Sequence, residues 1–91
     1  MVMTESPAIL KPLLKAVMQN EARQLAHGIT RTKERLTAFE KQFGMSSDEF
    51  MRRYETGEIQ ETLDFIDWWG ETEMLRLLKE EQLALSGARI K

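Results

Sequence analysis

The hydrophobic positions in the first half of the chain repeat with the spacing of a long amphipathic helix. From Met18 to Phe43 they recur at alternating intervals of four and three residues, which makes a heptad seam of more than three repeats. The members of this heptad seam are Met18, Ala22, Leu25, Ile29, Thr32, Leu36, Phe39 and Phe43. Further apolar residues between positions 9 and 17 widen the apolar face upstream. The pattern predicts one long helix that ends at Gly44, a residue suited to a left-handed cap.

Two prolines affect where this helix begins, and a glycine affects whether it is continuous. Pro7 after Ser6 is typical of a helix start with serine as the N-cap, although Pro12 could delay the start to about residue 11. Gly28 costs about 1 kcal/mol relative to alanine inside a helix, and Thr30 could cap a new one. The heptad seam nevertheless continues through this stretch without a break in phase. We therefore predict a continuous helix in which Gly28 allows another helix to approach closely.

The residues after Phe43 predict two more helices. Ser46 and Glu49 have the spacing of a capping box, so a short helix is expected over 47–56, with Gly57 as its stop. A third helix is expected over 62–85, with apolar residues on two flanks. Leu63, Ile66, Met74 and Leu77 share one flank, and Phe65, Trp68, Leu75 and Leu78 share the other. Two apolar flanks predict two contacts, one with the same chain and one with another.

These elements predict an all-α protein with a single domain over 1–91, in which 1–6 and 86–91 are flexible. A first helix of roughly 33 residues is about 50 Å long, whereas a compact globule of this chain length has a radius of gyration of only about 12 Å. One short and one medium helix are too small to cover such a rod. We therefore expect the heptad seam to join copies of the chain in an intermolecular helical bundle, as a homodimer or a higher homo-oligomer.

The composition of the chain excludes some kinds of site and some classes of protein. The chain has no cysteine, which excludes disulfides and thiolate metal sites. It has no apolar run of membrane-spanning length and no signal-peptide pattern at its start, so a cytoplasmic protein without a membrane span is expected. The net charge of −2 is unevenly distributed, because residues 1–41 carry +3 and residues 42–91 carry −5. Such blocks of charge affect how a protein associates with other molecules more than they affect its fold.

An acidic segment surrounds two adjacent tryptophans, Trp68 and Trp69. Between Tyr54 and Leu75 there is no lysine, arginine or histidine, but there are seven carboxylates: Glu55, Glu58, Glu61, Asp64, Asp67, Glu71 and Glu73. Three interpretations are open: a solvated acidic face, a docking surface for a basic partner, and a carboxylate metal site. The metal site lacks the accompanying Glu-x-x-His pattern. Tryptophan is over-represented at binding hot spots, so one or both rings are candidates to reach a partner.

The sequence gives little support for a catalytic site or for nucleic-acid binding. His27 is the only histidine and falls opposite the heptad seam, where it faces solvent, and Ser46 and Ser47 are explained as helix caps. Nucleic-acid binding is not indicated, because the basic residues of 31–35 are diluted by Glu34 and Glu40. No cofactor is expected, and the chain is not expected to be an enzyme.

The segment "FEKQFGMSSDEFMRRYETGEIQETLDFIDWWGETEMLRLL" resembles a pattern found in small prokaryotic antitoxin-like proteins. The shared features are a Gly-Met-Ser-Ser-x-x-Phe cap, a Gly-Glu turn and an acidic Asp-x-x-Trp helix, and they cover roughly half of the chain. On this resemblance Phe43, Gly44, Met45, Ser46 and Phe50 form the turn, and Phe65, Trp68 and Trp69 form the distinctive aromatic helix. The resemblance implies no catalytic residue.

The sequence thus predicts a non-enzymatic protein–protein interaction module, antitoxin-like, that neutralises a basic, toxin-like partner through its third helix. The predicted partner interface consists of Phe65, Trp68, Trp69, Asp64, Asp67 and Glu71. In this hypothesis the carboxylates select a basic partner and the rings supply most of the affinity. The alternative is a self-assembling structural bundle without a separate partner.

Overall fold

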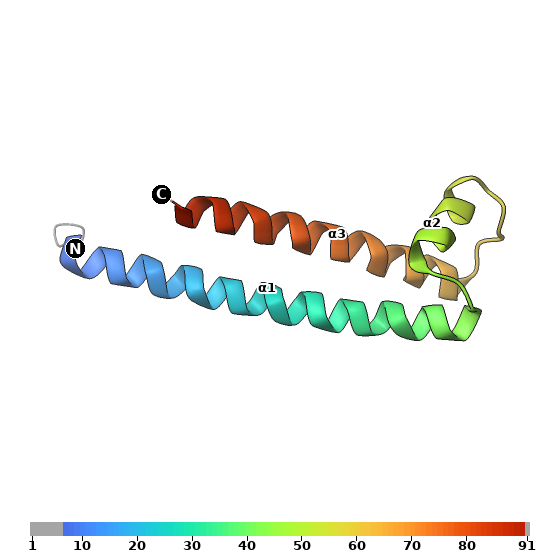
Figure 1. Ribbon diagram of the computed structural model, residues 1–91, viewed down its shortest axis with the longest axis horizontal. Coiled ribbons are helices and arrows are strands. Elements are labelled where there is room, and N and C mark those ends of the chain that lie inside the picture. Colours follow the sequence, from blue (N-terminus) through green and yellow to red (C-terminus); the bar gives the residue numbers. More distant parts are fainter. Residues whose placement is uncertain (1–6, 91) are drawn as a thin grey trace.

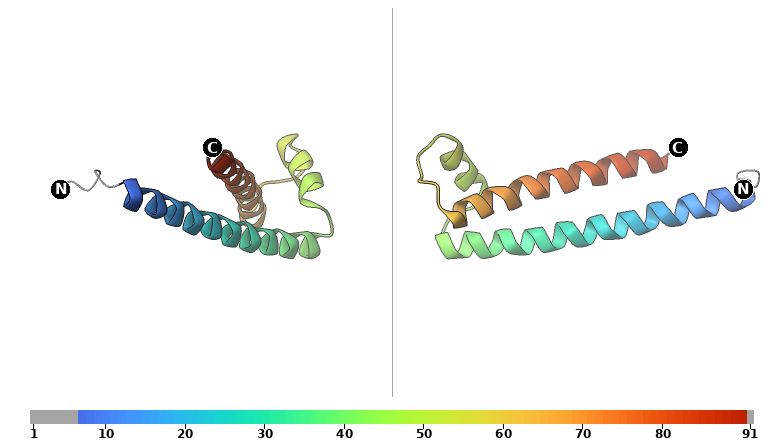
Figure 2. Two further views of the ribbon diagram at one scale, coloured as in Figure 1. Left: turned by 60° about the vertical axis from the view of Figure 1, so that its left-hand side comes forward. Right: turned by 180° about the vertical axis from the view of Figure 1, so that it is seen from behind.

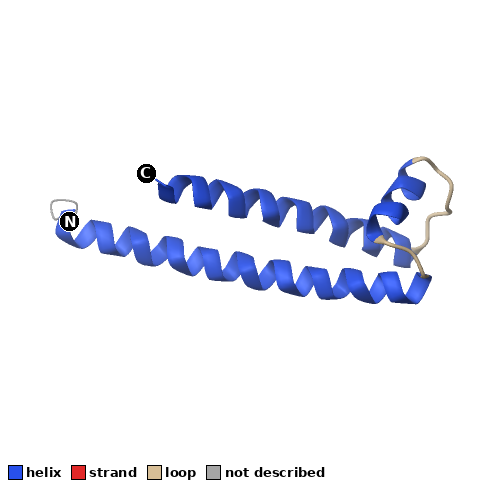
Figure 3. Cartoon of the chain, viewed as in Figure 1, coloured by secondary structure: helices blue, strands red, loops and turns tan. Residues whose placement is uncertain are grey.

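The computed structural model describes residues 7–90, which form a helical hairpin (Figure 1). Its helices are α1 (Pro7–Phe43), α2 (Ser47–Glu55) and α3 (Leu63–Ile90), and the described residues contain no strand (Figure 3). The long helices α1 and α3 lie antiparallel along each other, and the short α2 closes one end. The prediction of an all-α chain with a long, a short and a medium helix is confirmed.

The helix boundaries are set by local capping. Gly44 and Gly57 adopt φ angles of 70° and 79°, the left-handed conformation that ends α1 and follows α2. The Ser46 hydroxyl accepts a hydrogen bond from the Glu49 N–H at 3.1 Å, and the Thr62 hydroxyl accepts one from the Phe65 N–H at 3.1 Å. Both hydroxyls therefore act as N-caps, which confirms the predicted starts of α2 and α3 to within one residue.

The start of α1 at Pro7 agrees with the first of the two predicted starts, whereas the end of α3 differs from prediction. Helix α1 already includes Pro7, because Pro12 lies so near its start that it removes only one early hydrogen bond. Helix α3 extends past the predicted end near Leu85 to Ile90, because no proline interrupts it. Residues 1–6, including the predicted cap Ser6, and Lys91 lie outside the described residues.

The heptad seam packs inside the hairpin. Four of its residues are buried and four are half-buried: Leu25, Ile29, Thr32 and Leu36, and then Met18, Ala22, Phe39 and Phe43. Helix α3 covers them because its 28 residues begin at the closed end and follow α1 back along the seam. The surface that the sequence assigned to an oligomer is thus occupied by the same chain. Gly28 permits the predicted close approach, since a Cβ there would lie 3.3 Å from Cδ1 of Leu78.

An aromatic cluster holds the closed end together. The rings of Phe50 and Trp68 stack at a centroid distance of 4.0 Å with an interplanar angle of 2°, and both side chains are 0% exposed. Phe39 and Phe43 of α1 lie 5.5 and 5.6 Å from the Trp68 ring. The indole N–H of Trp68 donates to the Ser47 hydroxyl at 2.9 Å. One α3 residue therefore contacts both other helices.

Charged groups organise α2. The Ser47 N–H donates to the Glu40 carboxylate of α1 at 2.7 Å, which ties the start of α2 to the preceding helix. Glu49 accepts hydrogen bonds from Arg52 at 2.6 Å and from Arg53 at 2.7 Å. These two guanidinium groups, Arg52 first, lower the pKa of the Glu49 carboxyl from 4.5 to about 2.

Replacing Glu49 with glutamine is expected to weaken the acid dependence of stability. A carboxyl whose pKa is lower in the folded chain stabilises it fully above the unfolded value of 4.5, and loses this effect as the pH falls toward about 2. Urea unfolding at several pH values between 7 and 2.5 should therefore show a smaller loss of stability in Glu49→Gln than in the wild type. Asp48→Asn, which removes an exposed carboxylate of the same helical turn and leaves Glu49 with Arg52 and Arg53, is the matched control. Equal profiles for Glu49→Gln and the wild type would contradict the assignment.

The hairpin is elongated and open at one end. Its extents are 59 × 25 × 21 Å, and its radius of gyration is 18.9 Å, against about 12 Å for a compact globule of this length. Helix α1 has 37 residues and α3 only 28, so the first turns of α1 extend past the end of α3 (Figures 1 and 2). We call residues 8–17 the overhang. No described helix combines the length and hydropathy that crossing a membrane requires.

Candidate protein-interaction surface

The two adjacent tryptophans have opposite environments. Successive residues of an α-helix point about 100° apart, so neighbours cannot both face the same partner helix. Trp68 faces α1 and α2 and is 0% exposed, whereas Trp69 is 38% exposed. Only Trp69 can contact another molecule while the fold is intact.

The other residues of the predicted partner interface are also divided between the interior and the surface. Phe65 is half-buried and lies 5.0 Å from the Phe43 ring. Glu71 is half-buried and accepts a hydrogen bond from Arg35 of α1 at 3.0 Å. Asp64 and Asp67 are exposed. Of the six predicted residues, Asp64, Asp67 and Trp69 therefore remain at the surface, while Phe65, Trp68 and Glu71 serve the fold.

Most of the acidic segment has partners within the chain. Glu58 pairs with Arg52 at 3.2 Å, and Glu73 pairs with Arg76 at 3.0 Å. Glu61 accepts a hydrogen bond from the Tyr54 hydroxyl at 2.9 Å, which raises the pKa of Tyr54 above its usual value. Asp64 and Asp67 form no ion pair with any described residue, so their charge is available for recognition.

An apolar stripe runs along the outer side of α3, away from α1. Its residues recur at intervals of three or four, and its large members are exposed, Leu63 most of all at 82%. We define the outer stripe as Leu63, Ile66, Gly70, Met74 and Leu77. The opposite flank, with Trp68, Leu75 and Leu78, is buried or half-buried against the rest of the chain. The two predicted flanks are thus confirmed, and the outer stripe is the more exposed of the two.

Gly70 lies in the middle of the outer stripe without a structural reason inside the chain. Glycine costs about 1 kcal/mol relative to alanine in a helix interior. A Cβ at this position would meet nothing within 4 Å, so the packing of the described chain does not require glycine. A missing side chain in an exposed apolar stripe does leave room for another helix to come close.

The described surface also has two open grooves and an exposed histidine. One open groove is lined by Arg35, Ala38, Phe39, Gln42, Asp67 and Glu71, and another by Tyr54, Glu55, Glu61, Ile66 and Trp69. The first contains Oε1 of Glu71, which is buried without a hydrogen-bond partner. His27 is exposed beside Arg23 and Thr30 and lines neither of these grooves. Within residues 7–90, no three histidine, aspartate or glutamate side chains are grouped to hold a metal ion.

The helical spacing in the sequence places the large residues of the outer stripe on one flank, whereas the adjacent tryptophans indicate a different interface. The signal that favours the outer stripe over the tryptophans is Gly70, because it continues the three-and-four spacing between Ile66 and Leu77. In the sequence the overhang continues the broad apolar face of the first helix. Its apolar side chains, Ile9, Leu10, Leu13, Leu14 and Val17, are exposed, because α3 ends before it reaches them.

No protein-family model matches the chain, and no curated protein or solved structure does either. The function is therefore inferred from the surface geometry alone.

Proposed function

We propose that this protein is a non-enzymatic protein–protein interaction module that binds its partner through the outer stripe of α3. The observation that supports this function is the outer stripe itself, a row of exposed apolar side chains at helical spacing with Gly70 at its centre. Contiguous exposed apolar surface of this kind marks interaction sites in folded proteins. Leu63, Ile66 and Leu77 resemble the anchors with which one amphipathic helix binds another.

The antitoxin-like version of this function assigns a basic partner protein to the same face. Trp69 and the unpaired carboxylates of Asp64 and Asp67 favour it, because they place an exposed ring and free negative charge beside the outer stripe. Charge of this kind accelerates encounter with a basic partner and makes the association sensitive to salt. A purely apolar association would respond little to ionic strength.

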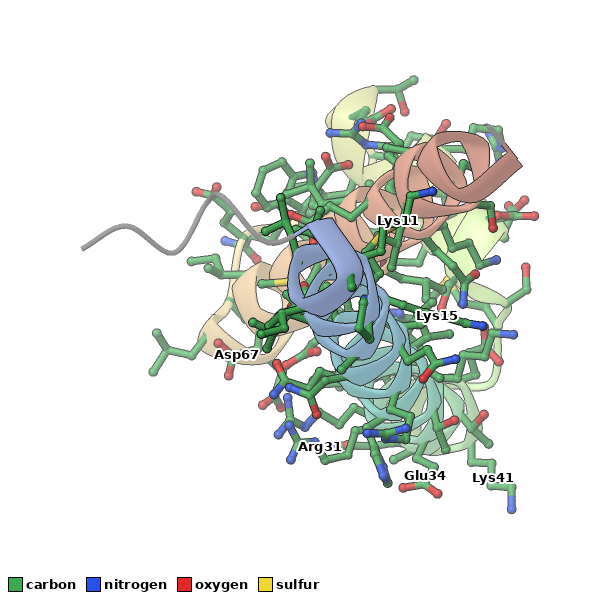
Figure 4. The ribbon with its side chains drawn as sticks, turned by 90° about the vertical axis from the view of Figure 1, so that its left-hand side faces the viewer. Lys11, Lys15, Arg31, Glu34, Lys41 and Asp67 are labelled. Carbon is green, nitrogen blue, oxygen red and sulfur yellow. The ribbon has the colours of Figure 1, made fainter. Side chains whose placement is uncertain are left out.

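Site-specific photo-cross-linking in cells of the native host tests the proposed surface. A photoreactive residue in place of Met74 should give a defined covalent adduct, because Met74 lies within the outer stripe. The same residue in place of Glu34, which projects from the far side of α1 (Figure 4), should give none. Adducts of equal yield from both positions, or from neither, would contradict the proposed function.

A second change within the outer stripe should remove that adduct without unfolding the chain. Leu77→Asp places a charge among the exposed apolar residues and should reduce the yield from Met74 by about tenfold. Because about half of Leu77 is exposed, the free energy of unfolding should fall by only about 1 kcal/mol. Thermal unfolding followed by circular dichroism checks the second point. An unchanged adduct yield in a folded Leu77→Asp chain would contradict the role of the outer stripe.

A further inference from the structure

We propose that the partner of the outer stripe is a second copy of this chain, whose overhang packs on the stripe beside Asp64 and Asp67. This inference rests on the proposed function, and it takes the basic overhang of a second copy, in place of a separate basic protein, as the occupant of the outer stripe. In the resulting dimer each copy would supply one overhang and one stripe, so the same contact would form twice. A pair of hairpins that lie side by side in opposite directions satisfies this requirement, because the open end of each then meets the closed end of the other.

The overhang and the outer stripe complement each other in polarity and in charge. The overhang presents five exposed apolar side chains, and its only charged residues are Lys11 and Lys15. The first half of the outer stripe presents Leu63 and Ile66. Asp67 lies one helical turn after Leu63, on the side of the stripe that borders α1, and Asp64 is exposed next to Leu63 in the sequence. A basic apolar surface and an acidic apolar surface thus occur on the same chain. Neither set of charges forms an ion pair with a described residue.

The two surfaces cannot meet within one chain. Asp67 lies beside Phe39 of α1, since Trp68 stacks on that ring and Asp67 lines a groove with it. Lys11 precedes Phe39 by 28 residues of the same helix, a separation of about 40 Å at 1.5 Å per residue. The view from the open end shows Lys11 and Lys15 on one side of the hairpin and Asp67 on the other (Figure 4). Only a second copy can bring these charges together.

The exposed surface has room for such an interface. The chain exposes 6882 Å², and a standard interface of ~800 Å² per partner would cover little more than a tenth of it. The exposed large hydrophobic side chains among the described residues all belong to α1 before residue 18 or to α3. Both helices contribute to the proposed dimer.

Charge reversal with rescue tests the proposal. One variant carries Lys11→Glu and Lys15→Glu, the other carries Asp64→Lys and Asp67→Lys, and each is studied alone by sedimentation equilibrium at low salt. The wild type should sediment as a dimer. In each variant alone like charges would face each other at both contacts, so the dissociation constant should rise by about tenfold or more. An equimolar mixture restores opposite charges at both contacts and should form a heterodimer with nearly the wild-type affinity.

A matched control separates this effect from a general change in charge. Arg31→Glu with Lys33→Glu reverses two exposed charges of α1 outside the overhang and should dimerise like the wild type. Because misfolded chains would not recover on mixing, the rescue shows that both variants are folded. A wild type that is monomeric at several hundred micromolar would overturn the inference, and so would a mixture that stays monomeric. The proposed function fails separately, if cross-links from Met74 are no stronger than those from Glu34.

Discussion

Replacing Trp68 with alanine is expected to destabilise the fold by about 3–5 kcal/mol, the range measured for large aromatic residues removed from a core. Trp68 is 0% exposed, stacks on Phe50 at 4.0 Å, and contacts Phe39 and Phe43 of α1. The substitution removes these ring contacts and the hydrogen bond to Ser47. A loss of this size is comparable to the whole stability of many small domains, so the variant should be largely unfolded at 37 °C.

Trp69→Ala is the matched control, since it removes the same side chain one position along the same helix. The Trp69 ring is 38% exposed and takes no part in the aromatic cluster, so its removal should cost about 1 kcal/mol or less. Trp68→Phe keeps an aromatic ring but loses the hydrogen bond, and should fall between the two. Urea unfolding of the three variants measures the order. Equal losses at Trp68 and Trp69 would contradict the assignment of only one ring to the core.

Phe50→Ala is expected to have the second largest effect, again about 3–5 kcal/mol, and to act first on α2. Helix α2 has nine residues, too few for an isolated helix to be stable in water. Phe50 is its only fully buried side chain and attaches it to Trp68 and Phe65. Hydrogen exchange should therefore show the α2 amides losing protection before those in the middle of α1 and α3.

Glu55→Ala, in the last turn of α2, provides the control for Phe50. Glu55 is exposed, and a negative charge at a helix C-terminus is unfavourable, so the variant should be as stable as the wild type or slightly more stable. Retained protection of the α2 amides in Phe50→Ala would show that α2 does not depend on this side chain. Lost protection in Glu55→Ala would show that α2 unfolds in response to any change.

The helix boundaries could be predicted because they depend on neighbouring residues. Gly44, Gly57 and Ser46 act through backbone conformation and one hydrogen bond each, and none of these depends on the rest of the fold. The pairing of helices could not be predicted in the same way. A heptad seam indicates that some helix covers it, but α3 of the same chain and α1 of another copy fit the pattern equally well.

The candidate interaction surface could likewise be predicted only in part from the sequence. Periodicity separated Trp68 from Trp69 into different directions but did not say which direction was inward, because that depends on how α3 is rotated against α1. The rotation is fixed by contacts distant in sequence, such as Phe39 with Trp68 and Gly28 with Leu78. The partners of the acidic segment also come from outside it, as Arg35 does for Glu71. The seven carboxylates counted in the sequence therefore indicate more unpaired negative charge than the folded surface carries.

The hairpin has a mechanical consequence that follows from the position of its ends. The start of α1 and the end of α3 lie at the same end of the molecule, and the aromatic cluster lies at the other (Figure 1). A force that pulls these two ends apart would load the contacts between α1 and α3 one turn at a time, from the open end inward. The hairpin should therefore unzip at low force until the load reaches Trp68 and Phe50, where several rings must separate together.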